Sequence, residues 1–470
     1  MADLLSGAWR ACVGTGRFNL ALRRDYQESL ALVQREIGFG HIRGHGLFGD
    51  DVGVHRPYTY GGEHRVRHAF TYVDQVIDAY LELGVRPFLE LGFMPGDLAS
   101  GDQTVFWWKG NVTPPRDHAE WAALVRATVA HLVDRYGIEE VRTWPIEVWN
   151  EPNLKDFWQD ADQAAYHRLY EVTAKTIKEI DASLQVGGPA ISPGSDEWMT
   201  DFADFVAAHD VPVDFVSRHA YSSHPARHVP FATLQGLAPA ETLLEQFATP
   251  RRQLAGGPLE GLPVHITEFN TSYRPDNAVH DTAHDAAYLA PVLAGGGDVC
   301  DSFSYWTFCD VFEEAGIPTS ILHGGFGLLT HRQLKKPTYH LYAFMARMGS
   351  HIVGRGEDHL VTRDERGRIT VLAWALEPRR IRLPLPPGEH FVVRSTVNEE
   401  HGNLRRAWLE MGSPHSPTPR QLDTLRELAE PYRTHRRADG GGLDLSLAQN
   451  EVTLVEVSPV IEEAPPWPLL

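Results

Sequence analysis

Short runs of apolar residues, rich in β-branched side chains, recur along the first two-thirds of the chain. Each run is apolar at successive positions rather than at alternate ones, which is typical of strands buried on both faces. The runs cover residues 39–45, 85–93, 146–150, 184–190, 213–221, 264–270 and 302–308, after a less regular first candidate at 9–17. Apolar residues recur at helical spacing over residues 70–83, 121–136 and 166–180. Gly84 and Gly137 are expected to end two of these helices.

Strands that alternate with helices predict an α/β fold with a parallel sheet. Eight strands over about 335 residues suit a (β/α)₈ TIM barrel, so we predict one for residues 1–335 and allow its first residues to pack on the domain that follows. A doubly wound open sheet is the alternative, but it usually has fewer units and carries a nucleotide fingerprint. Residues 44–49 match GxGxxG, yet acidic residues and a glycine follow instead of a helix, so we interpret the match as chance.

After about residue 335 the apolar residues alternate with polar ones. This pattern is typical of strands with one buried face, and it predicts a small antiparallel β-sandwich over residues 336–461. The expected strands cover residues 360–362, 369–374, 381–385, 391–395, 443–447 and 452–457, with a hairpin turn at 364–368 and a helix at 419–428. Residues 462–470 are rich in proline and are expected to form a loose tail.

The composition is that of a globular protein, with 43% hydrophobic and 22% charged residues. The formal net charge of −19 opposes binding to nucleic acids or to anionic membranes, and it favours neutral or cationic substrates. There are 12 Trp, 15 Tyr and 20 Phe residues, and those that do not fill the core are suited to stack on the apolar faces of sugars.

The three cysteines, Cys12, Cys300 and Cys309, form no CxxC pair and predict neither a disulfide framework nor a zinc site. The first residues lack a basic segment followed by an apolar run, so no signal peptide is expected. No stretch approaches 18 apolar residues, so no membrane span is expected, and a cytoplasmic location follows as an expectation. The sequence has no HExxH, GxSxG or P-loop motif, so neither a metal nor another cofactor is expected.

Two glutamates stand where predicted strands four and seven end. Glu151 lies in WPIEVWNEPN (144–153), and Glu268 lies in VHITEFN (264–270). The carboxyl ends of barrel strands carry the chemistry of this fold, and a carboxylate is costly to bury there without a function or a partner. Two carboxylates that face each other suit glycoside hydrolysis, which needs one protonated and one ionised group. The alternative is two structural glutamates, each paired with an arginine; Glu147 is a weaker candidate because it falls inside its strand.

These motifs resemble those of glycoside hydrolase family 39, a family of (β/α)₈ retaining glycosidases that includes β-xylosidases. The resemblance covers nearly the whole chain. The matching stretches are CVGTGR (12–17), HIRGHGLFGDDVG (41–53), RPFLELGFMP (86–95), SGDQTVFWWKGNVTPP (100–115), WPIEVWNEPNLKDFW (144–158), VGGPAI (186–191), VDFVSRHAYSS (213–223), HITEFNTSY (265–273) and DSFSYWTFCDVFEE (301–314).

The resemblance implies an exo-acting β-xylosidase that releases xylose from the non-reducing end of xylo-oligosaccharides. Glu268 would be the nucleophile and Glu151 the general acid/base of a double displacement, with carboxyl groups about 5–5.5 Å apart. Asn150 would hydrogen-bond the sugar 2-hydroxyl group, a bond that strengthens in the transition state. The other residues expected to hold the sugar or to shape the pocket are His45, His219, Tyr273 and Glu314, with Tyr221, Trp306, Glu313, Phe106, Trp107 and Phe157 as neighbours.

Phe269 stands where the family pattern usually has tyrosine, so any role of a hydroxyl group there is absent. Some related members carry a longer C-terminal extension that helps to assemble tetramers, so the resemblance leaves homo-oligomerisation open.

Three alternatives remain at the level of sequence. An α-L-iduronidase-like enzyme of the same superfamily would need a cation for its substrate carboxylate, which the net charge of −19 disfavours. An endo-acting xylanase would need an open cleft, whereas the long loop at 95–116 favours a closed pocket. A non-catalytic carbohydrate-binding protein on the same fold would not need both glutamates, since the fold alone fixes no function.

Overall fold

The computed structural model describes residues 3–229 and 232–460, which fold into two compact units. The first, here called the barrel unit, comprises Gly7–His280 and Gly295–Gln333. The second, here called the C-terminal unit, comprises the described residues of Met1–Ser6, Asp281–Ala294 and Leu334–Leu470. Among the described residues, no helix combines the length and the apolar character that crossing a membrane requires.

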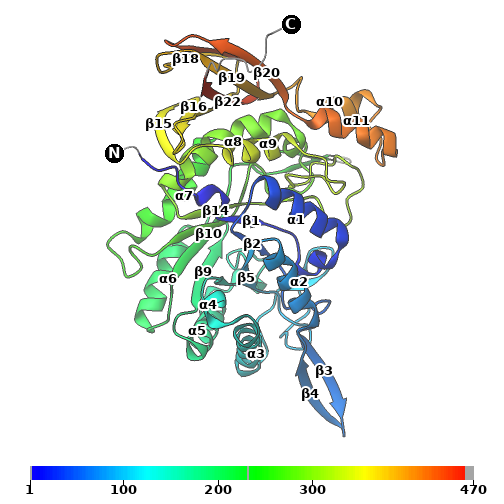
Figure 1. Ribbon diagram of the computed structural model, residues 1–470. Coiled ribbons are helices and arrows are strands. Elements are labelled where there is room, and N and C mark those ends of the chain that lie inside the picture. The colour runs from blue at the N-terminus through cyan, green and yellow to red at the C-terminus, as the bar shows by residue number, and fades with distance from the viewer. Residues whose placement is uncertain (1–2, 230–231, 461–470) are drawn as a thin grey trace. The chain divides into compact units, whose positions relative to one another are not determined.

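Eight parallel strands close into a barrel in the barrel unit, which confirms the predicted fold (Figure 1). Their order around the barrel follows the chain, and β2 and β14 both pair with β1. Most of their side chains are buried, which explains why they appear as continuous apolar runs in the sequence. The strands are β1 (Cys12–Gly14), β2 (His41–Gly44), β5 (Arg86–Leu91), β8 (Pro145–Val148), β9 (Gln185–Ile191), β10 (Phe215–Tyr221), β13 (Val264–Asn270) and β14 (Ser302–Tyr305).

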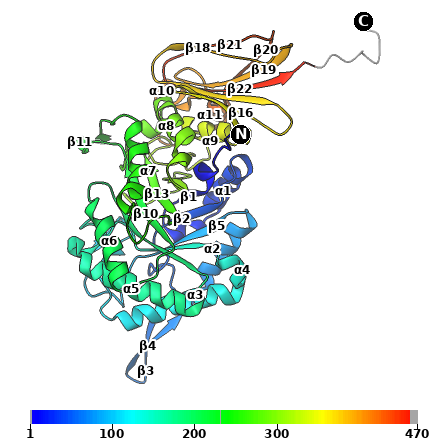
Figure 2. The same ribbon diagram turned by 90° about the vertical axis from the view of Figure 1, so that its left-hand side faces the viewer.

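Helices lie on the outside of these strands (Figures 1 and 2). The three segments with helical spacing are confirmed as α2, α3 and α5. Gly84 and Gly137 follow α2 and α3 with φ of +75° and +83°, positive values that glycine adopts readily where a helix ends. The helices are α1 (Arg24–Glu36), α2 (Thr71–Glu82), α3 (His118–Tyr136), α4 (Ile138–Val141), α5 (Gln163–Ile180), α6 (Glu197–Ala208) and α7 (Glu241–Leu254), with 3-10 turns η1 (Ala8–Arg10), η2 (Phe18–Leu22), η3 (Gln159–Ala161), η4 (Ala278–Asp281) and η5 (Gly296–Asp298).

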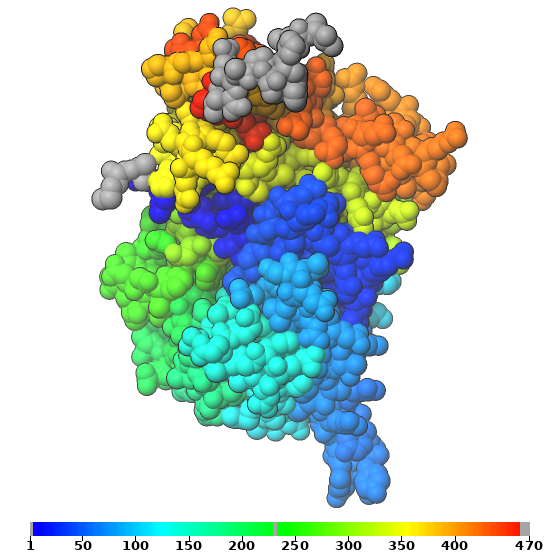
Figure 3. All heavy atoms as spheres, in the orientation of Figure 1, coloured from blue at the N-terminus to red at the C-terminus, as the bar shows by residue number. Residues whose placement is uncertain are grey.

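Short antiparallel hairpins extend the loops of the barrel unit. The hairpin of β3 (His55–Tyr60) and β4 (Glu63–His68) projects from the unit as a narrow arm (Figure 3). The sequence analysis missed it because most of its side chains are exposed and no apolar run marks it. Its turn, Gly61–Gly62 with φ of +63° and +82°, is the signal that would have located it. The other hairpins are β6 (Thr104–Val105) with β7 (Gly110–Asn111), and β11 (Arg227–Val229) with β12 (Ala232–Leu234).

The C-terminal unit contains a six-stranded antiparallel sheet and a two-stranded one, which confirms the predicted antiparallel region. Apolar side chains from both sheets, such as Val371 and Leu445, form a common core. The sheets contain β15 (His351–Gly356), β16 (His359–Arg363), β17 (Ile369–Ala375), β22 (Glu451–Pro459), β19 (His390–Val397) and β20 (Tyr432–Ala438), and β18 (Arg379–Leu383) with β21 (Leu443–Leu447). The helices are α8 (Ala283–Gly295), α9 (Pro337–Met345), α10 (Leu404–Glu410) and α11 (Pro419–Ala429).

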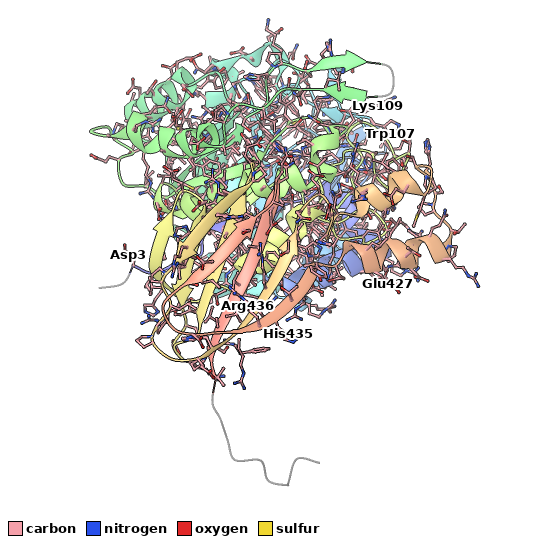
Figure 4. The ribbon with its side chains drawn as sticks, turned by 90° about the horizontal axis from the view of Figure 1, so that it is seen from above. Asp3, Trp107, Lys109, Glu427, His435 and Arg436 are labelled. Carbon is pink, nitrogen blue, oxygen red and sulfur yellow. The ribbon has the colours of Figure 1, made fainter. Side chains whose placement is uncertain are left out.

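Helix α11 and six of these strands were predicted, whereas β15, β20, α8, α9 and α10 were not. Strand β20 lacks the alternation on which the prediction relied, because its side chains from Tyr432 to Arg437 are all exposed. His435 and Arg436 are examples (Figure 4). The predicted tail at 462–470 lies outside the described residues.

Candidate active site

A cavity of about 620 Å³ lies at the carboxyl ends of the barrel strands. Its walls come from residues in or just after β2, β8, β10, β13 and β14, and from the loops that follow them. This is the end of a TIM barrel at which catalytic residues are found. Its lining residues are His45, Val105, Phe106, Asn150, Glu151, Leu154, Asp156, Phe157, Ser192, Pro193, Tyr221, Ser223, Pro225, Glu268, Tyr273, Arg274, Pro275, Trp306, Glu314, Ala315 and Phe326.

The two predicted carboxyl groups face each other in this cavity. Glu151 follows β8 and Glu268 belongs to β13, and an oxygen of each lies within 4.8 Å of the other. Both are buried, with 8% and 5% of their surface exposed. His219 on β10 connects them, because its Nδ1 lies 2.8 Å from Oε1 of Glu151 and 3.4 Å from Oε2 of Glu268. The structure therefore brings together side chains from β13, from β10 and from the segment after β8 in one cluster.

The backbone after β8 adopts an unusual conformation to present Glu151. Trp149 and Glu151 have φ of +73° and +44°, which is costly for residues with a side chain. Two hydrogen bonds hold this turn: the indole Nε1 of Trp149 donates to the carbonyl of Phe157 (2.8 Å), and the amide of Glu151 donates to the carbonyl of Ala190 (3.0 Å). The surrounding barrel thus fixes the position of the Glu151 carboxyl group.

The two glutamates have different surroundings. Burial, and after it the nearby Glu268 carboxylate, raises the pKa of Glu151 well above its ordinary value, so Glu151 can hold a proton for donation. Glu268 accepts hydrogen bonds from Arg43 Nη1 (2.7 Å) and from the hydroxyl of Tyr221 (2.8 Å), and both donors favour a negative charge on it. Burial and the positive charges of Arg43 and His45 lower the pKa of His219 well below its ordinary value, so this imidazole is neutral.

Arg43 is a site residue that the sequence analysis did not identify. It lies on β2, is fully buried and forms ion pairs with three carboxylates: Nε with Glu147 (2.6 Å), Nη1 with Glu268 (2.7 Å) and Nη2 with Glu90 (3.0 Å). Nη2 also donates to Oδ1 of Asn150 (3.0 Å). An arginine within a predicted buried strand was the available signal. Of the two glutamates for which pairing with an arginine was the alternative, Glu268 pairs with this guanidinium, and Glu147, the weaker candidate, pairs with it as well.

His45 lies directly after β2 and contacts three carboxylates. Its Nδ1 is 2.7 Å from Oε2 of Glu90, and its Nε2 is 3.5 Å from Glu314 and 3.6 Å from Glu268. Burial opposes a charge on the ring, but Glu90, Glu314 and Glu268 outweigh it and raise the pKa of His45 to about 10. His45 is therefore an imidazolium at neutral pH.

Aromatic rings form much of the remaining wall. Trp306 and Phe106 lie 4.8 and 5.7 Å from the ring of His45, and Phe157 packs edge-on against Phe106 at 5.4 Å. Tyr273 has 44% of its surface exposed and lies at the mouth. All four belong to the residues that the sequence analysis selected, and all four line the cavity.

Two predicted residues lie elsewhere. Glu313 forms ion pairs with Arg17 (3.1 Å) and Arg23 (2.9 Å) and does not line the cavity. Its neighbour Glu314 lines the cavity instead. Trp107 is 54% exposed and borders a separate surface hollow together with Lys109; Figure 4 labels both.

Several lining residues had no signal in the sequence. They lie in the irregular loops after β8, β9, β13 and β14, where neither spacing nor residue type distinguishes them. The polar ones are Asp156, Ser192 and Arg274, and the apolar ones include Leu154, Pro275 and Phe326.

Glu151, His219 and Glu268 are the residues in the described part of the chain whose ligand atoms converge closely enough to suit a metal ion. The 2.8 Å contact between His219 and Glu151 is a hydrogen-bond distance, and the raised pKa of Glu151 removes the charge that a cation needs. The donor set therefore suits proton transfer better than metal coordination.

Comparison with known proteins gives concordant matches. The model of the family "Glycosyl hydrolases family 39" matches residues 2–441. A β-xylosidase of Geobacillus stearothermophilus is 50% identical over 97% of this chain and 93% of its own length. A β-xylosidase of Caldicellulosiruptor saccharolyticus is 37% identical over 90% of this chain and 88% of its own. A solved structure, a monomeric β-xylosidase from Caulobacter crescentus CB15, is 33% identical, covers 98% of both chains and superimposes with a TM-score of 0.89.

Proposed function

The chain belongs to glycosyl hydrolase family 39, and on that basis we propose that it is an exo-acting, retaining β-xylosidase. The substrate would be a xylo-oligosaccharide, from whose non-reducing end the enzyme releases xylose. The observation that carries the proposal is the carboxyl pair, Glu151 and Glu268, with oxygens within 4.8 Å in a cavity lined by aromatic rings. Retaining glycosidases need carboxyl groups about 5–5.5 Å apart, whereas inverting ones need about 6.5–9.5 Å.

In the first step, Glu268 attacks the anomeric carbon of the xylosyl residue and forms a covalent ester with it. The bond between that carbon and the glycosidic oxygen breaks, and Glu151 gives its proton to the leaving oxygen. Two features support these roles: the pKa of Glu151 is raised by burial and by Glu268, and Arg43 and Tyr221 donate to Glu268.

In the second step, Glu151 accepts a proton from water while the water oxygen attacks the anomeric carbon and displaces Glu268. The ester carries no negative charge, so the interaction that helps to raise the pKa of Glu151 in the free enzyme is absent at this stage. Glu151 can then act as a base where it previously acted as an acid.

Asn150 is placed to bind the sugar 2-hydroxyl group. Its Oδ1 accepts a hydrogen bond from Arg43 Nη2 (3.0 Å), which leaves Nδ2 as the atom that can donate to the sugar. Trp306, Phe106 and Tyr273 offer rings to the sugar, and Glu314 offers carboxylate oxygens to its hydroxyl groups.

An α-L-iduronidase-like activity is the second candidate. It would need a cation that is free to bind a substrate carboxylate, but Arg43 and His45 are already paired with the carboxylates beneath the sugar position. Arg274, on the loop after β13, is the arginine among the described lining residues, and its Nε lies 3.4 Å from Asp276. Comparison of p-nitrophenyl xyloside, an aryl iduronide and polymeric xylan as substrates would separate the two activities and an endo-acting enzyme.

Product stereochemistry tests the proposal. In ¹H NMR of aryl β-xyloside hydrolysis, the β-anomer of xylose should appear before mutarotation produces the α-anomer; first appearance of the α-anomer would exclude retention.

Glu268→Ala should lose turnover and form the α-xylosyl azide when azide is added. Glu120→Gln changes an exposed glutamate on α3 and is a control that should keep full activity. Retained turnover in Glu268→Ala would refute the assignment, and absence of turnover by the native protein would favour a binding function.

A further inference from the structure

Glu90 is a buried carboxylate that touches both cations of the site without reaching the cavity itself. It lies on β5, with 1% of its surface exposed, and is not among the lining residues. Its Oε2 lies 2.7 Å from His45 Nδ1 and 3.0 Å from Arg43 Nη2. Both cations in turn approach the proposed nucleophile, Arg43 at 2.7 Å and His45 at 3.6 Å. One carboxylate therefore holds the two positive groups that surround Glu268.

The contacts of His45 indicate that its ring carries both protons. A neutral imidazole has one N–H donor and one acceptor nitrogen, and a carboxylate offers only acceptors. Nδ1 faces Glu90 and Nε2 faces Glu314 and Glu268, so both nitrogens face carboxylate oxygens. The other charged or titratable groups around this ring are Arg43 on the same strand, Glu151, which carries a proton, and His219, which is neutral.

We propose that Glu90 is a positioning residue of the hydrolytic reaction, one that keeps His45 as an imidazolium beneath the sugar, with its Nε2–H directed at Glu314 and Glu268. The inference rests on the proposed function, because that function makes Glu314 a sugar-binding group and Glu268 the nucleophile. Glu90 would act through His45 and Arg43 and would contact no reacting atom.

The charge on His45 matters for Glu314 in particular. Burial raises the pKa of Glu314, and the hydrogen bond and positive charge of His45 oppose that rise. An ionised carboxylate binds a sugar hydroxyl more strongly than a protonated one does. Loss of the charge on His45 should therefore weaken sugar binding at Glu314 and remove one of the positive groups near Glu268.

Glu147 provides a matched control because it shares only one of the two contacts. It is as buried as Glu90 and pairs with Arg43 Nε at 2.6 Å, but its other hydrogen bond comes from Thr267 (2.9 Å) rather than from His45. Glu90→Gln and Glu147→Gln each remove one negative charge beside Arg43 and keep the shape of the side chain. Only Glu90→Gln also removes the carboxylate from His45.

The first measurement is the pH dependence of kcat and KM for an activated dinitrophenyl β-xyloside in the Glu151→Gln background, in which the alkaline limb that Glu151 would contribute is absent. In Glu90→Gln, His45 should lose its proton more than two pH units lower than with Glu90 in place, so the alkaline fall in kcat/KM should move to lower pH by the same amount. At pH 7, kcat/KM should drop about 100-fold, with part of the loss in KM. Glu147→Gln should keep the native position of the alkaline limb. Glu90→Asp, which restores a carboxylate, should return the limb toward its native position.

The second measurement is the ¹⁵N NMR spectrum of histidine side chains, with His45 assigned by its loss in His45→Asn. At pH 8 the native protein should show His45 with both nitrogens protonated, and Glu90→Gln should show it neutral. A neutral His45 in the native protein, or an unmoved alkaline limb in Glu90→Gln, would overturn the proposal. If Glu90→Gln fails to fold, the spectrum of the native protein still tests whether His45 is charged. Because the spectrum needs no turnover, an inactive native protein with a charged His45 would count against the β-xylosidase activity alone.

Discussion

Asn150 offers a direct test of the transition-state contact with the sugar 2-hydroxyl group. Asn150→Ala removes the amide whose Oδ1 accepts from Arg43 Nη2 (3.0 Å) and whose Nδ2 would donate to the sugar. The substitution leaves Nη2 with its ion pair to Glu90 (3.0 Å), so Arg43 remains compensated and the nucleophile keeps its donor. The loss should therefore reflect the sugar contact rather than collapse of the charged cluster.

The expected size follows from the kind of bond. A buried hydrogen bond contributes about 0.5–1.5 kcal/mol when neutral and about 1.5–3 kcal/mol when a partner is charged. The sugar ring gains positive charge in an oxocarbenium-like transition state, so we expect the upper range. At about 1.4 kcal/mol for each tenfold change, kcat/KM should fall about 10- to 150-fold.

The assay is a cycle of two enzymes and two substrates. Native protein and Asn150→Ala are compared on p-nitrophenyl β-xyloside and on its 2-deoxy analogue, which lacks the hydroxyl group. The variant should lose activity on the xyloside and little on the 2-deoxy analogue, giving a coupling energy of about 1.5–3 kcal/mol. Equal losses on both substrates would show that Asn150 acts elsewhere, and the role assigned to it would be wrong.

Three further predictions follow from the same geometry. Burial and Glu268 raise the pKa of Glu151, and the protonated form of Glu151 is the proposed acid, so kcat/KM should fall as pH rises through that raised pKa. In Glu151→Gln, the pH profile for hydrolysis of an activated dinitrophenyl xyloside should lack this alkaline fall. Glu313→Gln should lower the melting temperature, because it removes the charged partner that Glu313 gives to Arg17 and Arg23, while KM stays within about twofold. A large rise in KM would show that Glu313 does contribute to substrate binding. Phe106→Ala should raise KM about tenfold, as expected for loss of an aromatic contact of up to about 1.5 kcal/mol, and an unchanged KM would show that the ring only closes the wall.

The barrel strands could be predicted because parallel strands are buried on both faces and therefore appear as apolar runs. The same rule explains why other elements could not be predicted. Strand β20 and the β3–β4 hairpin expose nearly all of their side chains, so no pattern of burial appears in their sequences. The hairpin is instead fixed by its Gly61–Gly62 turn, a local signal of backbone conformation rather than of hydrophobicity.

The positions of the two glutamates proposed as catalytic were predictable from strand ends and motifs, but the cluster beneath them was not. Arg43 contacts Glu147 and Glu268 across sequence separations of 104 and 225 residues, which no local pattern records.

The need to compensate a buried charge nevertheless connects these residues. A charge within a buried strand must be compensated, and the inward faces of barrel strands meet only one another. Arg43, Glu90 and Glu147 each interrupt an apolar strand, so each needs a partner from another strand of the same barrel. A strand-by-strand search for opposite charges would therefore have pointed to one buried cluster, and its excess of carboxylates would have indicated that a further cation, here His45, had to join it.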